Sequence, residues 1–181
     1  MKYAAKLDYE IDLRPLTGAS TALLRDYNKL QHYCKGMPGD YVLQAKEGWA
    51  AKNKSVSNAD VFIDQLPSEL LAQERPYVII LELPAFETDN PVLPAHRDYN
   101  KTCGINLYLE ANGEKTTFYN WNRQTRQCDY VEEFCASTGE LWIMNTDVPH
   151  SVTLVSKKAR SMLSFCFTKM KYEQVLAHFQ Q

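Results

Sequence analysis

From residue 77 to residue 168 the chain is a series of short apolar runs, rich in β-branched and aromatic residues and separated by turn residues. Runs of this kind are typical of strands in a sandwich or a barrel. The runs are YVIILEL at 77–83, GINLYL at 104–109, TTFYNW at 116–121, YVEEF at 130–134, ELWIM at 140–144, SVTLV at 151–155 and SMLSFCFT at 161–168. Many short antiparallel strands in about 100 residues favour a jelly roll.

The segments on either side of this β-rich region are expected to be mainly helical. Residues 20–36 place apolar side chains at helical spacing with charged ones between them, which predicts an amphipathic helix. Residues 60–74 are interpreted as one or two helical turns, the second opened by Pro67. Residues 171–179 are interpreted as a closing helix, and residues 3–13, which alternate weakly, as an edge strand.

The length of 181 residues suits one domain with a real core. We expect residues 1–75 to form a mostly helical N-terminal support, residues 76–168 the β core and residues 169–181 a C-terminal helix. Residues 39–58 are irregular, polar and contain glycine. They are interpreted either as a loop over a site or as a solvated connection.

The charge and cysteine content exclude several classes of protein. A net charge of −2 gives no bulk attraction to nucleic acid or membranes, whose binders usually carry a basic excess. No apolar run approaches the roughly 20 residues that span a bilayer. The five cysteines form no Cys-x-x-Cys pair, which argues against a disulfide framework and a thiolate zinc site. We expect a cytoplasmic protein with reduced thiols and no secretory signal.

Two histidines and one aspartate in the β-rich region form a pattern that suits a metal site. His96 and Asp98 are two residues apart in LPAHRDYN, so on an extended strand they point to the same face. His150 in NTDVPHSV is the candidate for a second imidazole, and Pro149 favours an extended approach to it. Two histidines and a carboxylate on one face leave other positions open, as in non-haem Fe(II) oxygenases.

Each part of this pattern also has an ordinary structural interpretation. A His-x-Asp sequence alone is more often a surface pair, and His150 alone is more often a hydrogen-bonded turn residue. Arg160 follows two lysines and could be a solvated surface charge. The pattern becomes specific when the parts are taken together, because His-x-Asp, a run of strands, a second histidine and Arg160 ten positions later follow in that order.

These segments resemble the 2-oxoglutarate/Fe(II)-dependent dioxygenase superfamily, and they are most similar to its small prolyl- or aspartyl-hydroxylase-like members. The resemblance lies in PAHRDYN, GINLYL, GELWIMNTDVPHSV and ARSMLSF, roughly residues 93–168. It implies a double-stranded β-helix, a cupin-like jelly roll with iron at one mouth. It also implies Fe(II), 2-oxoglutarate and O₂ as cofactor and co-substrates, with succinate and CO₂ released as a substrate is oxidised.

The resemblance also implies roles for individual residues. His96, Asp98 and His150 match the three iron ligands. Arg160 matches the basic residue that pairs the far carboxylate of 2-oxoglutarate, which suits a guanidinium because it can hold a carboxylate with two parallel hydrogen bonds. Many members place Ser or Thr two residues after this arginine, whereas this chain has Met162.

Other residues are candidates for the co-substrate pocket. Ser164 lies on the strand face of Arg160 and is a candidate donor to the same carboxylate. Asn106 and Tyr108 share one face of their strand and could line the pocket, but the alternating apolar residues of that strand could face inward instead.

The prime substrate is expected to be an amino acid, a peptidyl side chain or a small metabolite. Arg97, Tyr119 and Trp121 are candidates for its rim, although aromatic strand residues belong more often to a core. A non-catalytic cupin-like module that binds a metal or a ligand is the alternative function. A different cupin chemistry, in which Arg160 is incidental, is a third interpretation. The sequence leaves the oligomeric state open.

Overall fold

The computed structural model describes residues 2–27, 51–83, 92–98, 101–122, 124–125, 127–153 and 158–180, which consist mainly of β-strands. The strands are β1 (Ala4–Leu7), β2 (Thr21–Tyr27), β3 (Ala51–Val56), β4 (Tyr77–Leu83), β5 (Val92–His96), β6 (Cys103–Glu110), β7 (Lys115–Asn122), β8 (Gln127–Cys135), β9 (Leu141–Asn145), β10 (His150–Thr153) and β11 (Arg160–Phe167). The helices are the 3₁₀ turn η1 (Arg14–Gly18), α1 (Ala59–Ile63), α2 (Ser68–Gln73) and α3 (Tyr172–Ala177).

The strands form two antiparallel sheets. The large sheet has the order β1-β9-β6-β11-β4-β3-β2 and the small sheet the order β5-β10-β7-β8. The chain from β4 to β11 passes repeatedly between the sheets, so β4, β6, β9 and β11 lie in the large sheet and the remaining four in the small one. This winding is a double-stranded β-helix, and the predicted jelly roll is confirmed.

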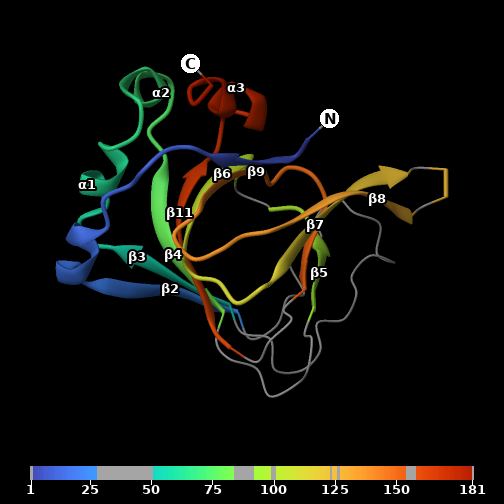
Figure 1. The fold of residues 1–181 in the computed structure, drawn as a ribbon, viewed down its shortest axis with the longest axis horizontal. Coiled ribbons are helices and arrows are strands. Elements are labelled where there is room, and N and C mark those ends of the chain that lie inside the picture. The colour runs from blue at the N-terminus through green and yellow to red at the C-terminus, as the bar shows by residue number, and fades with distance from the viewer. Residues whose placement is uncertain are drawn as a thin grey trace.

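Alternation along the strands gives the large sheet two different faces. On the outer face, Leu163, Phe165 and Phe167 of β11 belong to the main hydrophobic cluster, together with Leu70 of α2 and Val175 of α3. The helices cover this side, opposite β5, β7 and β8 (Figure 1). On the inner face the alternate residues of β6 and β11 point toward the small sheet, so polar side chains there line the interior of the jelly roll.

The N-terminal region corrects one prediction. Residues 21–27 of the predicted helix form β2, which pairs with β3, and β3 pairs with β4. The remainder of that predicted helix lies outside the described residues. Helical spacing is a weak preference, and pairing along the edge of the sheet overrides it by satisfying the backbone of the whole segment. Residues 1–75 are therefore not mostly helical where described.

Other local predictions are confirmed. β1 is the edge strand expected within residues 3–13, and Pro67 is the N-cap of α2. The tail forms α3 within its predicted range. The prediction of an irregular segment at 39–58 is wrong for residues 51–56, which form β3 and pair with β2 and β4, and residues 39–50 lie outside the described residues.

Candidate metal centre

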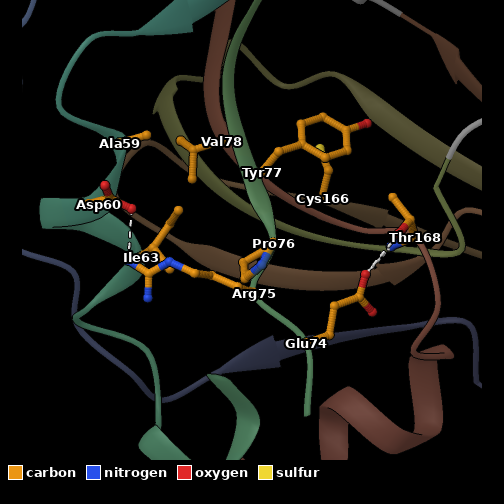
Figure 2. Close-up of a pocket in the computed structure, with 10 residues that line it drawn as sticks. All are labelled: Ala59, Asp60, Ile63, Glu74, Arg75, Pro76, Tyr77, Val78, Cys166 and Thr168. Carbon is orange, nitrogen blue, oxygen red and sulfur yellow. Dashed lines mark hydrogen bonds and ion pairs between the residues drawn. The ribbon is translucent and has the colours of Figure 1, made fainter. Parts of the chain in front are cut away.

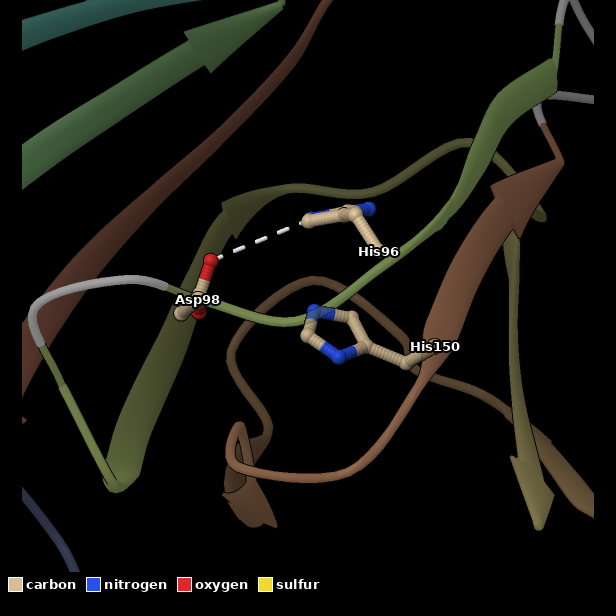
Figure 3. Close-up of side chains that lie close together, drawn as sticks. All are labelled: His96, Asp98 and His150. Atoms are coloured by element: carbon tan, nitrogen blue, oxygen red, sulfur yellow. Dashed lines mark ion pairs between the residues drawn. The ribbon is translucent and has the colours of Figure 1, made fainter. Parts of the chain in front are cut away.

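The structure brings His96, Asp98 and His150 together. His96 ends β5 and His150 begins β10, and the two are partners in the ladder that joins these strands. Their ring centroids are 4.5 Å apart. Asp98 follows two residues after His96, and its backbone N–H donates to the Thr146 carbonyl at 3.0 Å. One ligand atom from each of the three residues lies within 4.8 Å of the others (Figure 3).

The two imidazoles are buried and oriented by their surroundings. His96 is 7% exposed and His150 is 4% exposed. The Nδ1 atom of His150 lies 3.0 Å from the Val148 carbonyl. A carbonyl can only accept, so Nδ1 carries the proton and Nε2 keeps its lone pair for a ligand. The ring of Phe118, with its centroid 5.9 Å from that of His150, packs beside it and limits its movement.

Electrostatics keep His150 and Asp98 in the forms that bind metals. Burial and the neighbouring His96 lower the pKa of His150 to about 4, so its imidazole is neutral near pH 7. Burial alone would raise the pKa of Asp98, but Lys101 and the two histidines outweigh it and lower that pKa. A neutral imidazole and an ionised carboxylate are the species that coordinate a cation.

The donor set fits Fe(II). Two imidazole nitrogens and one carboxylate oxygen converge from one side, and the Nε2 of His96 lies 3.8 Å from Oδ1 of Asp98. Hard carboxylate and borderline imidazole ligands in this two-to-one ratio suit non-haem Fe(II), which requires further open positions for reactants. In Figure 3 the three side chains approach one another from β5, the segment after it and β10.

Lys101 is a neighbour of this centre that the sequence did not reveal. Its Nζ lies 3.1 Å from Oδ2 of Asp98, the oxygen that does not face His96. Burial disfavours the ammonium, but Asp98 raises the pKa of Lys101 above its ordinary value. The spacing of three residues between them is too common among charged residues to have identified the contact.

Arg160 and Tyr108 lie together in the interior. Arg160 begins β11, is 4% exposed, and donates from Nη2 to the Tyr108 hydroxyl at 3.2 Å. Its Nε also lies 3.0 Å from Oε1 of Glu114, a buried carboxylate that sequence reasoning missed. Glu114 follows a glycine in a turn, which normally indicates a solvated side chain, so no local pattern could have placed it here.

Asn106 and Ser164 also face the interior. They are cross-strand partners of β6 and β11, and the Ser164 hydroxyl donates to Oδ1 of Asn106 at 2.6 Å. Ile105 and Leu107 belong to the cluster on the opposite face. This settles which face of β6 points inward, because the polar residues and not the aliphatic ones line the jelly-roll interior.

The three rim candidates are placed differently. Arg97, which lies between His96 and Asp98 in the sequence, is partly exposed and forms an ion pair with Asp147. Phe118 faces the interior, so alternation puts Tyr119 and Trp121 on the outer face of the small sheet. There the Tyr119 hydroxyl lies 2.9 Å from the Ser151 hydroxyl. The structure therefore does not bring Tyr119 or Trp121 to the metal ligands.

A pocket of about 430 Å³ lies beside the N-terminal end of β4. Its walls come from α1, from the segment before β4 and from the end of β11, as Figure 2 shows. None of the three candidate ligands lines it. The pocket is thus a feature separate from the metal centre.

Comparison with solved structures finds a likeness in fold at low sequence identity. No protein-family model and no curated protein sequence matches the chain. A solved structure of an oxidoreductase of the 2OG-Fe(II) oxygenase family from Burkholderia pseudomallei is similar over 70% of this chain and 69% of that one, with 12% identity and a TM-score of 0.39. So low a TM-score supports no conclusion about activity or cofactor. Within the described residues, no helix has the length and apolar character needed to cross a membrane.

Proposed function

We propose that this chain is an Fe(II)- and 2-oxoglutarate-dependent oxygenase that hydroxylates an amino acid, a peptidyl side chain or a small metabolite. The observation that supports this most is the convergence of His96, Asp98 and His150 at the end of a jelly roll, with ligand atoms within 4.8 Å. Two imidazoles and one carboxylate on one face are the donor set of Fe(II) oxygenases.

The bound metal, with 2-oxoglutarate and O₂, would supply the oxidation: one oxygen atom enters succinate, the other the substrate hydroxyl group, and CO₂ leaves. In this proposal His96, Asp98 and His150 hold the metal. Arg160 holds the distal carboxylate of 2-oxoglutarate with charged hydrogen bonds, and Tyr108 supplies a hydroxyl group beside it.

The remaining interior side chains shape the same space. In this proposal the polar atoms of Asn106 and Ser164 lie between the metal ligands and Arg160. Both side chains are buried on the inner face of the large sheet. Phe118 and Met162 are apolar and buried, and in this proposal they would keep water out of the space between the metal ligands and Arg160. Arg97, at the partly exposed rim, is the residue among the three rim candidates that remains a proposed substrate contact. The free thiols of Cys103 and Cys166 suit a reducing compartment, and the cytoplasm is the proposed location.

The test follows succinate by proton NMR after incubation of Fe(II)-loaded protein with 2-oxoglutarate and ascorbate in air. We expect succinate from the wild type and none above background from His96→Ala. His178→Ala is the matched control, because His178 lies beyond α3 and contacts Gln73, away from the metal ligands. Succinate should persist in this variant.

The alternative is a cupin-like module that binds a metal or a ligand without turnover. One observation favours it: the guanidinium of Arg160 already faces the Glu114 carboxylate. The melting temperature discriminates the two functions, because a specific ligand stabilises the folded state. If 2-oxoglutarate yields no succinate and leaves the melting temperature of the Mn(II)-loaded protein unchanged, the oxygenase proposal is wrong.

A further inference from the structure

The guanidinium that we assign to the co-substrate is already opposite a carboxylate of the protein. Glu114 is 2% exposed and Arg160 is 4% exposed, and Oε1 of the one lies 3.0 Å from Nε of the other. Two charges so deeply buried are rarely retained unless they compensate each other. Arg160 therefore enters the interior as half of a neutral pair rather than as an isolated cation.

The turn between β6 and β7 fixes Glu114 in this position. Gly113 adopts a φ of 84°, which a glycine accepts without strain, and the next residue turns inward. Oε2 of Glu114 accepts a hydrogen bond from the backbone N–H of Asn112 at 2.7 Å. The side-chain amide of Asn112 donates to the Ala159 carbonyl at 2.6 Å. The turn is thus joined directly to the residue that precedes Arg160.

The ion pair leaves part of the guanidinium for another ligand. Within the described residues, Arg160 Nε and Glu114 Oε1 make no hydrogen bond of normal angle, although they are in ion-pair contact. The Nη2 atom donates to the Tyr108 hydroxyl, and the guanidinium carbon lies 5.2 Å from the centroid of the Tyr108 ring. Glu114 is thus on the Nε side, and the Nη side faces Tyr108.

A second carboxylate at this guanidinium would be attracted by Arg160 and repelled by Glu114. Like charges a few ångströms apart in a buried site disfavour each other strongly, since little water screens them. The residue two positions after Arg160 is Met162, which has no hydroxyl group to add a compensating hydrogen bond. Both features weaken the capture of a distal carboxylate.

We propose that Glu114 sets the affinity and selectivity of the co-substrate pocket by compensating Arg160 and so weakening its hold on a dicarboxylate. This inference rests on the proposed function, since it names a determinant of the same site. Its consequence is that occupancy of the pocket follows the concentration of 2-oxoglutarate instead of saturating at low levels. It also reduces the preference for a 2-oxo acid with a distal carboxylate over one without it.

The test compares two ligands by calorimetry on Mn(II)-loaded protein, which binds without turnover. The ligands are 2-oxoglutarate and 2-oxopentanoate, which has a methyl group in place of the distal carboxylate. Glu114→Gln, of nearly equal shape, is expected to bind 2-oxoglutarate about tenfold more tightly, because one repulsive charge is removed. Its affinity for 2-oxopentanoate should stay within about twofold. Glu110→Gln is the matched control, exposed at the end of β6, and should change neither affinity.

The outcomes separate the inference from the proposed function. If the wild type binds 2-oxoglutarate and Glu114→Gln binds it equally or more weakly, the inference is wrong and the function stands. A variant that weakens both ligands equally would show that Glu114 only supports the structure, which also overturns the inference. If neither protein binds 2-oxoglutarate, both proposals are wrong.

A measurement on the wild type keeps the inference testable if Glu114→Gln does not fold. If Glu114 compensates Arg160, the wild type should bind 2-oxoglutarate no more than about tenfold more tightly than 2-oxopentanoate. A guanidinium without such compensation, bound to the distal carboxylate by two hydrogen bonds, would favour 2-oxoglutarate far more strongly. A preference of about a thousandfold would contradict the inference.

Discussion

Lys101 places a positive charge against one of the metal ligands, and its role can be decided by the sign of one effect. Its Nζ holds Oδ2 of Asp98 at 3.1 Å, so only Oδ1 faces His96. A partner that orients a ligand usually contributes tenfold or more to metal affinity, whereas a bare cation near a metal ion repels it. These two effects have opposite signs.

We predict that Lys101→Met weakens Co(II) binding by about 10–100-fold, because the freed carboxylate no longer presents a single oxygen. Lys101→Arg should recover part of this loss, since it keeps the charged donor. A competitive titration against a fluorescent chelator measures the affinity, and the visible spectrum of bound Co(II) reports the coordination. Lys115→Met is the control, because Lys115 pairs with Glu133 on the surface. Tighter binding in Lys101→Met would mean that charge repulsion dominates.

His150 makes the stability of the metal-free protein depend on pH. Its pKa is about 4 in the folded state, against an ordinary 6.5. Between these values the unfolded chain binds a proton at this position that the folded chain does not, so stability falls as pH is lowered from about 6.5 to about 4. We expect a loss on the order of 2 kcal/mol from this group. Urea unfolding with chelator present measures it, and His150→Asn should show a flatter profile. Parallel profiles for the two proteins would refute the assignment.

At the scale of elements, Glu74 joins the segment before β4 to the corner between β11 and α3. Its Oε1 accepts the backbone N–H and the hydroxyl group of Thr168 at 2.7 and 2.9 Å. Its Oε2 accepts the backbone N–H of Met170 at 2.7 Å. Burial raises the pKa of Glu74, but these donors outweigh it and keep the pKa below its ordinary value. The carboxylate thus satisfies backbone groups that no strand or helix pairs.

We predict that Glu74→Gln destabilises the fold by about 1–3 kcal/mol, because the amide offers one acceptor oxygen and turns an NH₂ group toward donors. Chemical denaturation measures the change in the free energy of unfolding. Glu69→Gln is the control, since Glu69 is exposed on α2 and should lie within about 0.5 kcal/mol of the wild type. Equal changes in the free energy of unfolding for the two substitutions would show that the contacts of Glu74 do not stabilise the fold.

Elements and sites differ in how far local sequence determines them. That Asn106 and Tyr108 share one face of β6, and that His96 and Asp98 lie on the same side of the chain, was predictable because both follow from the two-residue period of extended chain. Which face of β6 points inward was not predictable, because it depends on the helices that cover Ile105 and Leu107. β2 was not predictable, because its helical spacing competes with a ladder to β3 that only the complete sheet supplies. Glu114 was not predictable either, since its burial depends on Arg160, which comes from a distant strand.

At the scale of the whole molecule, the candidate ligands connect the two sheets. His96 and His150 belong to the small sheet, whereas the Asp98 backbone is hydrogen-bonded to Thr146, just after β9 of the large sheet. The Thr146 N–H in turn donates to the Thr102 carbonyl, and the Thr102 N–H donates to the last residue of β11. A cation held by all three ligands would therefore oppose separation of the two sheets. Because separation of the sheets is global unfolding, the cation would stabilise the whole fold and not only the site.

We therefore predict that Mn(II) at a hundred times its dissociation constant stabilises the protein by about 2.7 kcal/mol. For a chain of this size that corresponds to a rise of about 5–10 °C in melting temperature. Differential scanning calorimetry with and without metal measures it. His150→Ala should abolish the rise while His178→Ala retains it, because only His150 belongs to the cluster. A rise of the same size in His150→Ala would place the binding elsewhere and would remove the main support for a metal centre that joins the sheets.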